Sequence, residues 1–250
     1  MNLIYYVCFG EKYKKYTAMS IWSLVNIGKY EGDIFVLGDI CEFDNKYGIN
    51  DKVTFFNIKD DIQRLMNIDE KTSVISHFQN TKALLQFYTN INDYEFVLYL
   101  DSDVLINTSK INEMINSYSK GDKIVIQSDR STIGGKRGIN CGFNLFTEEE
   151  IKRYGHIGLC SGVVGFPVKK FGVNFLNLWN SKNKELGYSN SDQGNLHWVI
   201  AKFYEKDFKY IEDTKVHRSI DKSDTTILHF FRKRLSNMDV YFEKHLNGPI

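Results

Sequence analysis

The segment 95–106, EFVLYLDSDVLI, limits the possible folds of this chain more than any other. Residues 97–100 are four apolar residues in a row, which is typical of a strand buried on both faces of a parallel sheet. Two carboxylates, Asp101 and Asp103, follow directly. In open α/β sheets ligands bind at the carboxyl end of the strands. The segment therefore predicts an α/β sheet with an acidic site at its edge.

The rest of the chain supplies the other elements of such a fold. Strands alternate with helices in the first half, which favours parallel βαβ units, and the less regular second half predicts added strands and loops around the same sheet. We predict strands over 3–9, 33–37, 53–57, 124–127 and 162–166, and helices over 16–25, 81–89, 171–180 and 193–203. A chain of 250 residues with no linker rich in Pro, Gly or Ser is expected to form one domain, 1–250.

Composition excludes several classes of protein. Lys+Arg at 32 and Asp+Glu at 31 leave a net charge of +1, too little for nucleic-acid binding by a broad basic field. No apolar run approaches the ~20 residues of a membrane span, and the N-terminal apolar stretch is too short for a signal peptide. The cysteines form no CxxC pair, which predicts reduced thiols and a cytoplasmic protein. They are Cys8, Cys41, Cys141 and Cys160.

The two carboxylates of the 95–106 segment indicate a cation. If the backbone stays extended through 101–103, Asp101 and Asp103 project to the same side and converge. Carboxylate oxygens select Mg²⁺ or Mn²⁺, which often share their coordination with substrate phosphates. An isolated DxD is more often a solvated turn, but the apolar run in front of it favours function. Dinucleotide-binding and P-loop chemistry are excluded, because the first strand is not followed by GxGxxG and residues 133–137 lack the rest of a Walker loop.

The DxD after an apolar strand is followed by further motifs, in the order in which one enzyme family carries them. The chain resembles this glycogenin-like and lipopolysaccharide galactosyltransferase-like family, family 8 of the retaining glycosyltransferases. The family's D-Q pair at a helix start appears as Asp192-Gln193, and its C-terminal histidine as His229. The resemblance implies a single-domain GT-A fold, α/β with a Rossmann-like, mostly parallel central sheet flanked by helices and a smaller added β region. It also implies that Asp101, Asp103 and His229 hold Mn²⁺ or Mg²⁺.

The resemblance further implies the residues that contact a nucleotide-sugar donor. Lys82 matches the family's basic residue on the helix before the DxD strand, and Tyr13 matches an aromatic that packs on uracil. Val7 and Cys8 lie in the adjoining stretch, and Ser102 is the middle residue of the DxD.

The second half departs from the family pattern at two motifs. Ser161 and Gly162 match the N-[SA]-G-V strand, but Cys160 replaces the asparagine that typically touches the donor sugar. After His229 the usual Gly and Lys-Pro-Trp continuation is missing. Residues 232–234 are all basic there, and we expect Lys233 to contact phosphate.

The implied activity is metal-dependent transfer of a sugar, with retention, from a UDP-sugar to a glycan, lipid-linked glycan or protein acceptor. Asp192 and Gln193 would serve the reaction, with Asp192 near the reacting carbon. Residues 1–106 would bind the nucleotide, 107–220 the donor sugar and the acceptor, and 221–250 would fold over the nucleotide. The basic C-terminal segment could also contact a membrane surface.

Other interpretations stay open at this stage. Lys82 could be an exposed helix charge, Asp192 a helix cap and His229 a core histidine. A sugar-1-phosphate nucleotidyltransferase would share the sheet and the acidic site, but residues 9–12 supply no Gly-rich phosphate loop. A non-catalytic module that binds sugar nucleotides or polysaccharides is the third possibility, although a metal ligand would then be expected to be lost.

Overall fold

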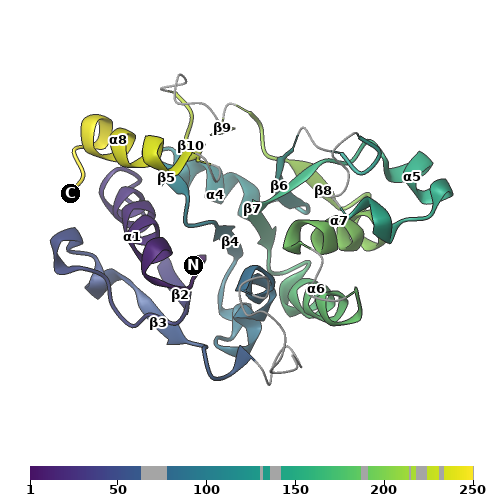
Figure 1. Cartoon of the computed structure of the whole chain (residues 1–250), viewed down its shortest axis with the longest axis horizontal. Helices are drawn as coiled ribbons and strands as arrows, with labels where there is room; N and C mark the ends of the chain where they lie inside the picture. Colours follow the sequence, from purple (N-terminus) through teal and green to yellow (C-terminus); the bar gives the residue numbers. More distant parts are fainter. Residues whose placement is uncertain are drawn as a thin grey trace.

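The computed structural model describes residues 1–62, 78–129, 132–135, 142–186, 191–213, 215–217, 224–230 and 234–249. These residues form a mixed α/β fold in which a twisted sheet lies between two layers of helices (Figure 1). The predicted fold class is confirmed.

The large sheet has seven strands in the order β3-β2-β1-β4-β7-β6-β8. Strand β7 pairs antiparallel with both of its neighbours, and all other neighbouring pairs are parallel. The strands are β1 (Asn2–Cys8), β2 (Asp33–Gly38), β3 (Thr54–Asn57), β4 (Phe96–Leu100), β6 (Ile124–Ser128), β7 (Leu159–Pro167) and β8 (Phe208–Tyr210). Every residue of β4 and of β7 is buried, as the apolar run at 97–100 predicts.

A second, three-stranded sheet joins the middle of the chain to its C-terminal part. Its order is β5-β10-β9, with β5 (Val104–Ile106), β9 (Val216–His217) and β10 (Ile227–His229). Strand β10 runs antiparallel to β5, and His229 lies opposite Val104. This sheet is the smaller added β region.

Alternating side chains of the central strands feed two hydrophobic cores, one on each face of the large sheet. Leu3 and Tyr5 of β1 enter one core, while Ile4 and Tyr6 enter the other. The first core is covered by the 3₁₀ helix η3 (Gln79–Phe87) with α6 (Gly172–Leu186) and α7 (Asp192–Phe203). The second is covered by α1 (Glu11–Asn26), α4 (Ile111–Ser119) and α8 (Leu235–Leu246). The other helices within the described ranges are α5 (Glu148–Tyr154), η1 (Asn45–Tyr47), η2 (Asn50–Lys52), η4 (Ile91–Asp93) and η6 (Phe143–Leu145).

The helices of the structure differ from the predicted helices at two places. The segment predicted as a helix at 81–89 is the 3₁₀ helix η3, whose course is interrupted at Ala83 (φ −87°, ψ 15°). A 3₁₀ turn repeats every three residues rather than every 3.6, and the apolar Phe87 on η3 is 49% exposed. The C-terminal segment, where no helix was predicted, contains α8, which packs along α1 (Figure 1).

The contacts between α1 and α8 are both polar and apolar. Lys15 Nζ lies 2.6 Å from Asp239 Oδ1, and the rings of Trp22 and Phe242 meet edge to face at 5.1 Å. The described ranges contain no helix that is both long enough and apolar enough to cross a membrane.

Candidate metal and donor site

The two aspartates of the DxD lie in a turn between sheets. Strand β4 ends at Leu100 and β5 begins at Val104, so the condition of an extended backbone through 101–103 is not met. The backbone N–H of Asp101 donates to the carbonyl of Gly162 on β7 (2.8 Å), and the carbonyl of Asp103 accepts from Phe230 N–H (2.7 Å). The two carboxylates therefore converge because of this turn, which is held at both ends, and not because of the pleat of an extended strand.

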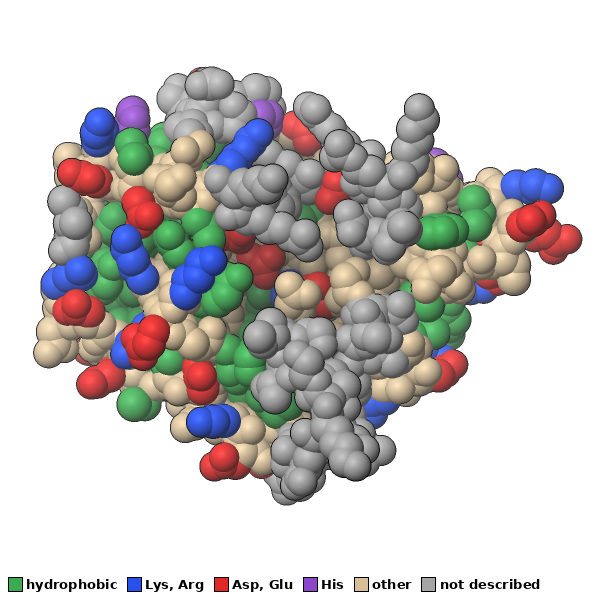
Figure 2. Space-filling view, in the orientation of Figure 1, with side chains coloured by type: hydrophobic (Ala, Val, Ile, Leu, Met, Phe, Trp, Pro, Cys, Tyr) green, Lys and Arg blue, Asp and Glu red, His purple; other side chains and the backbone are tan. Residues whose placement is uncertain are grey.

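Asp101, Asp103 and His229 meet at this turn, as predicted. Each offers one ligand atom, and the three atoms lie within 4.8 Å of one another. His229 Nε2 is 3.1 Å from Asp103 Oδ1 and 4.0 Å from Asp101 Oδ2. Figure 2 shows acidic side chains deep in a hollow near the position of β4 in Figure 1. Two carboxylates and one imidazole are a donor set that suits Mn²⁺ or Mg²⁺.

Gly162 leaves room for this cluster. A Cβ at this position would lie 2.3 Å from Cε1 of His229 and 2.7 Å from Oδ2 of Asp101. Any larger residue would therefore displace both side chains. The glycine predicted to contact the donor is thus a wall of the candidate cation site, and the space beside it fits the group that the three ligands would hold.

His229 is almost fully buried and its electrostatics depend on Asp103. Burial alone would lower the pKa of His229, but the carboxylate of Asp103 raises that pKa to about 10, with a smaller contribution from the Cys160 thiol. The imidazole of the metal-free protein is therefore protonated at neutral pH. Because a ligating nitrogen must be deprotonated, cation binding would release this proton and would strengthen as pH rises.

An irregularity in β7 shapes the floor of the site. The register between β6 and β7 passes from Ile126↔Val164 to Gln127↔Cys160, so 161–163 have no partner on β6. In this stretch Ser161 contacts Lys82, and Gly162 lies against His229 and Asp101. A β-bulge commonly redirects side chains out of the regular ladder.

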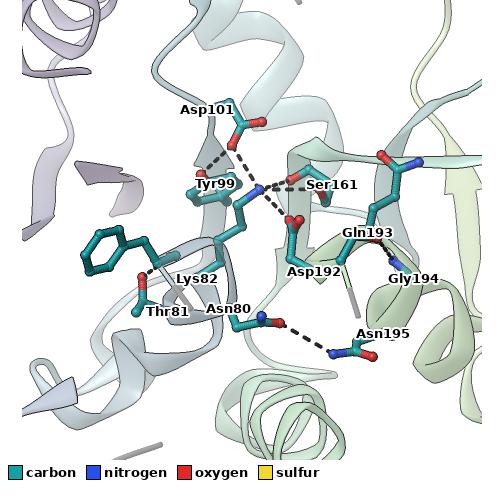
Figure 3. A network of polar contacts seen from close by, with 12 residues as sticks. Asn80, Thr81, Lys82, Tyr99, Asp101, Ser161, Asp192, Gln193, Gly194 and Asn195 are labelled. Atoms are coloured by element: carbon teal, nitrogen blue, oxygen red, sulfur yellow. Dashed lines mark hydrogen bonds and ion pairs between the residues drawn. The ribbon is translucent and has the colours of Figure 1, made fainter. Parts of the chain in front are cut away.

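Lys82 lies at the centre of a second cluster, beside the first (Figure 3). Its side chain is buried, with Nζ 2.9 Å from Asp101 Oδ1 and 2.7 Å from Asp192 Oδ2. The ammonium also donates to the carbonyl and the hydroxyl of Ser161, both at 3.3 Å, and lies 4.7 Å from the centroid of the Tyr99 ring. Lys82 is therefore a buried counter-charge, and the interpretation as an exposed helix charge is wrong.

The charges of this cluster stabilise one another. Burial alone would lower the pKa of Lys82, but Asp101 and Asp192 outweigh it and hold that pKa above its usual range. Burial would likewise raise the pKa of Asp101, yet Lys82 and His229 keep it lowered. Tyr99 adds a hydrogen bond from its hydroxyl to Asp101 Oδ1 (2.5 Å). Asp101 thus directs its Oδ2 toward the candidate cation site and its Oδ1 toward Lys82.

Asp192 and Gln193 open α7. The helix cap is Ser191, whose hydroxyl accepts from Gly194 N–H (3.1 Å), so Asp192 is not the capping residue. Asp192 is instead buried against Lys82 in the first turn, where a negative charge is also favoured by the helix dipole. In Figure 3 the Gln193 side chain extends away from the Lys82 ammonium.

His197 fixes this end of α7 to the sheet. Its Nε2 accepts from Leu159 N–H (2.8 Å), and its Nδ1 lies 2.7 Å from the carbonyl of Gln193. Burial lowers the pKa of His197 to about 4, so the ring is neutral. These two contacts give His197 a structural role.

The residues predicted on the nucleotide side lie near the first strand and α1. Ser102 Oγ donates to the carbonyl of Val7 (3.3 Å) and accepts from Thr17 Oγ1 (2.8 Å). Tyr13, 47% exposed, is in the first turn of α1, and its carbonyl oxygen lies 2.9 Å from Thr17 Oγ1. Cys8 is buried, and burial raises its pKa to about 12, so its thiol is inert.

One predicted contact cannot be placed. Lys233 lies outside the described residues, as does Cys141. The described thiols are free, with Cys8 and Cys160 buried and Cys41 exposed.

Sequence reasoning missed three residues of the site. Tyr99 had a usable signal, because it lies on β4 two residues before Asp101, at the spacing that puts two side chains of an extended chain on the same side. Gln127 is a polar residue at the end of the apolar run 124–126, a weak signal on its own. Thr17 lies on α1 and reaches Ser102 only through the tertiary fold.

Comparison with known proteins identifies the fold by structure alone. No protein-family model matches the sequence, and no curated protein is significantly similar to it. Among solved structures, the galactosyltransferase LgtC, in complex with donor and acceptor sugar analogues, matches with a TM-score of 0.61 and 15% identity over 98% of this chain and 94% of that one. Mouse xyloside xylosyltransferase 1, in its apo form, matches with a TM-score of 0.59 and 13% identity over the whole of both chains.

A third match is the glycosyltransferase GlyE of Streptococcus pneumoniae TIGR4, with a TM-score of 0.56 and 12% identity over 98% of this chain and 61% of that one. At such low identity these likenesses show the fold. The chain has the GT-A fold, as the sequence resemblance implied.

Proposed function

We propose that this chain is a metal-dependent glycosyltransferase of the family 8 type, which moves a sugar from a UDP-sugar to a glycan, lipid-linked glycan or protein acceptor with retention of configuration. One observation carries the proposal. Asp101, Asp103 and His229 converge within 4.8 Å at the edge of the sheet, directly beside the buried pair of Lys82 and Asp192. The shared fold with glycosyltransferases supports it.

The two clusters of the site would have different roles in the reaction. Asp101, Asp103 and His229 would hold the cation, which when bound supplies positive charge to the leaving diphosphate. Lys82 adds a second, preorganised positive charge next to it. Because this ammonium lies 2.7 Å from Asp192 Oδ2, it fixes the orientation of the Asp192 carboxylate.

Asp192 is our candidate for the group that faces the anomeric carbon, with Gln193 beside it. A buried carboxylate can act as a transient nucleophile or can orient the sugar, and both roles are compatible with its position. On the nucleotide side, Val7 and Ser102 line the edge of the sheet and Tyr13 offers an exposed ring. The cytoplasm remains the proposed compartment, on the cysteine pattern.

The proposal is tested by screening nucleotide sugars for hydrolysis in the presence of Mn²⁺. We expect turnover of a UDP-sugar that stops when a chelator removes the metal. Asp103→Ala should abolish both turnover and Mn²⁺-dependent UDP binding, whereas Asp51→Ala, which removes an exposed carboxylate on η2, should change neither.

The outcomes separate the competing functions. Mn²⁺-dependent UDP binding with no turnover on any donor or acceptor would favour the non-catalytic module. Release of pyrophosphate from a nucleoside triphosphate and a sugar phosphate would favour the nucleotidyltransferase. UDP affinity that is the same with and without Mn²⁺ would exclude the metal-dependent mechanism.

A further inference from the structure

The imidazole of His229 is held through both of its nitrogens. Nε2 faces Asp103 Oδ1 at 3.1 Å, and Nδ1 lies 2.7 Å from Oε1 of Gln127. An amide oxygen can only accept a hydrogen bond, so the proton of that bond belongs to Nδ1. Nε2 is then the nitrogen that offers a lone pair to a cation.

The position of Gln127 follows from the irregular pairing of β6 with β7. Residues 124–126 of β6 are fully buried in the two apolar cores, and the register shifts directly after them. Gln127, 3% exposed, lies opposite Cys160 past that shift. A buried amide is costly without a partner, and the His229 ring is the partner of its oxygen.

We infer that Gln127 is a positioning residue for His229: its side-chain oxygen holds the proton on Nδ1 and turns Nε2 toward Asp101 and Asp103. The inference rests on the proposed metal function. A neutral imidazole can carry its proton on either nitrogen, and the hydrogen bond made by one nitrogen decides which one binds a metal. An amide does this without adding a third negative charge to the site.

The test uses two variants of opposite effect. Gln127→Met has similar length but no acceptor, and Gln127→Glu keeps an acceptor oxygen. We expect Gln127→Met to weaken Mn²⁺ binding about 10- to 100-fold, as measured by calorimetry without nucleotide, in line with the usual effect of losing the partner of a ligating histidine. Gln127→Glu should retain the affinity. Gln86→Met, which removes a glutamine amide from η3, is the matched control and should bind as the wild type does.

A second measurement does not depend on any variant being folded. Nitrogen-15 spectra of the Mg²⁺-saturated wild type should show the His229 proton on Nδ1 and none on Nε2. A proton on Nε2 in that state, or Gln127→Met with wild-type Mn²⁺ affinity and only a lower melting temperature, would overturn the inference. The proposed function is tested separately. If the wild type binds no Mn²⁺, the proposed function and the role of Gln127 are both excluded. If Asp103→Ala loses Mn²⁺ binding and Gln127→Met keeps it, only the role of Gln127 is excluded.

Discussion

At the scale of single residues, Lys82 is the side chain whose charge connects two carboxylates of the site. It is a buried cation between two carboxylates, and its removal leaves Asp192 without the ammonium that faces it and Asp101 with His229 as its counter-charge. Breaking a buried ion pair from one side typically costs about 3–5 kcal/mol. We therefore predict that Lys82→Met lowers the free energy of unfolding by about that amount, measured by urea denaturation without metal.

Two controls accompany this variant. Lys82→Arg keeps the charge and should retain most of the stability. Lys52→Met breaks a pair with Asp51 in which both side chains are more than half exposed, so it should cost roughly 0–1 kcal/mol. If Lys82→Met costs no more than Lys52→Met, the carboxylates are not held by Lys82.

Asp192 can now be tested apart from helix capping, because Ser191 is the cap. Asp192→Asn keeps the size of the side chain and removes its charge. If the carboxylate acts on the transition state, turnover with the true donor and acceptor should fall roughly a hundredfold or more.

The matched control for Asp192→Asn is Glu148→Gln, which removes a carboxylate from the first turn of α5. This variant should leave turnover unchanged. Near-normal turnover in Asp192→Asn, with the fold intact, would assign Asp192 a structural role.

At the scale of elements, the position of α7 depends on a neutral histidine. Burial lowers the pKa of His197 to about 4, whereas an unfolded histidine titrates near 6.5. Between these values the unfolded chain binds a proton that the folded chain does not, so stability falls as pH falls. The contribution is fully present above pH 6.5 and about 3 kcal/mol of it is lost by pH 4.

We predict this loss in urea unfolding measured from pH 7 down to pH 4.5. His197→Gln should be less stable at pH 7 and should lack most of the slope. His229 does not contribute in this window, because its raised pKa gives stability that is complete below pH 6.5 and is lost only as pH rises toward 10. Equal slopes in the two proteins would contradict the assignment.

The elements predicted from the sequence were those whose local pattern decides their structure. Strand β4 was predicted because an unbroken apolar run suits a doubly buried strand, and α7 because its helical pattern follows a cluster of Ser and Asn. Strand β10 has three residues, and its pairing with β5 is set by a long-range contact that no local pattern records. Helix η3 departs from the α-helix predicted for it, and the buried Lys82 on it pairs with residues from two other elements.

Some missed elements had readable signals. In α4 the buried residues Ile111, Met114, Ile115 and Tyr118 follow helical spacing. In α5 a capping box joins Thr147 to Glu150. The candidate site was predictable to the extent that its residues lie in ordered motifs. The pairing of Lys82 with Asp192 and of Gln127 with His229 was not, since each joins distant parts of the chain.

At the scale of the whole molecule, the proposed donor makes a prediction about thermal stability. A ligand at 100 times its Kd stabilises the folded state by about 2.7 kcal/mol, which for a chain of this size raises the melting temperature by roughly 5–10 °C. We expect UDP with Mn²⁺ to do so, and a chelator to cancel the effect.

The identity of the base needs its own test, because aromatic stacking on Tyr13 does not by itself select uracil. GDP and CMP with Mn²⁺ are therefore the comparison. Greater stabilisation by either than by UDP would refute a uridine donor while leaving the metal site standing.

The pairing of β5 with β10 has a consequence for the folding of the whole chain. A cation held by Asp101, Asp103 and His229 would act as a cross-link that closes a long loop of chain. Such a link removes entropy from the unfolded state, and more so for a longer loop. Because α8 follows β10 directly, a chelator should release the C-terminal region first, and limited proteolysis should then begin there rather than at the central sheet.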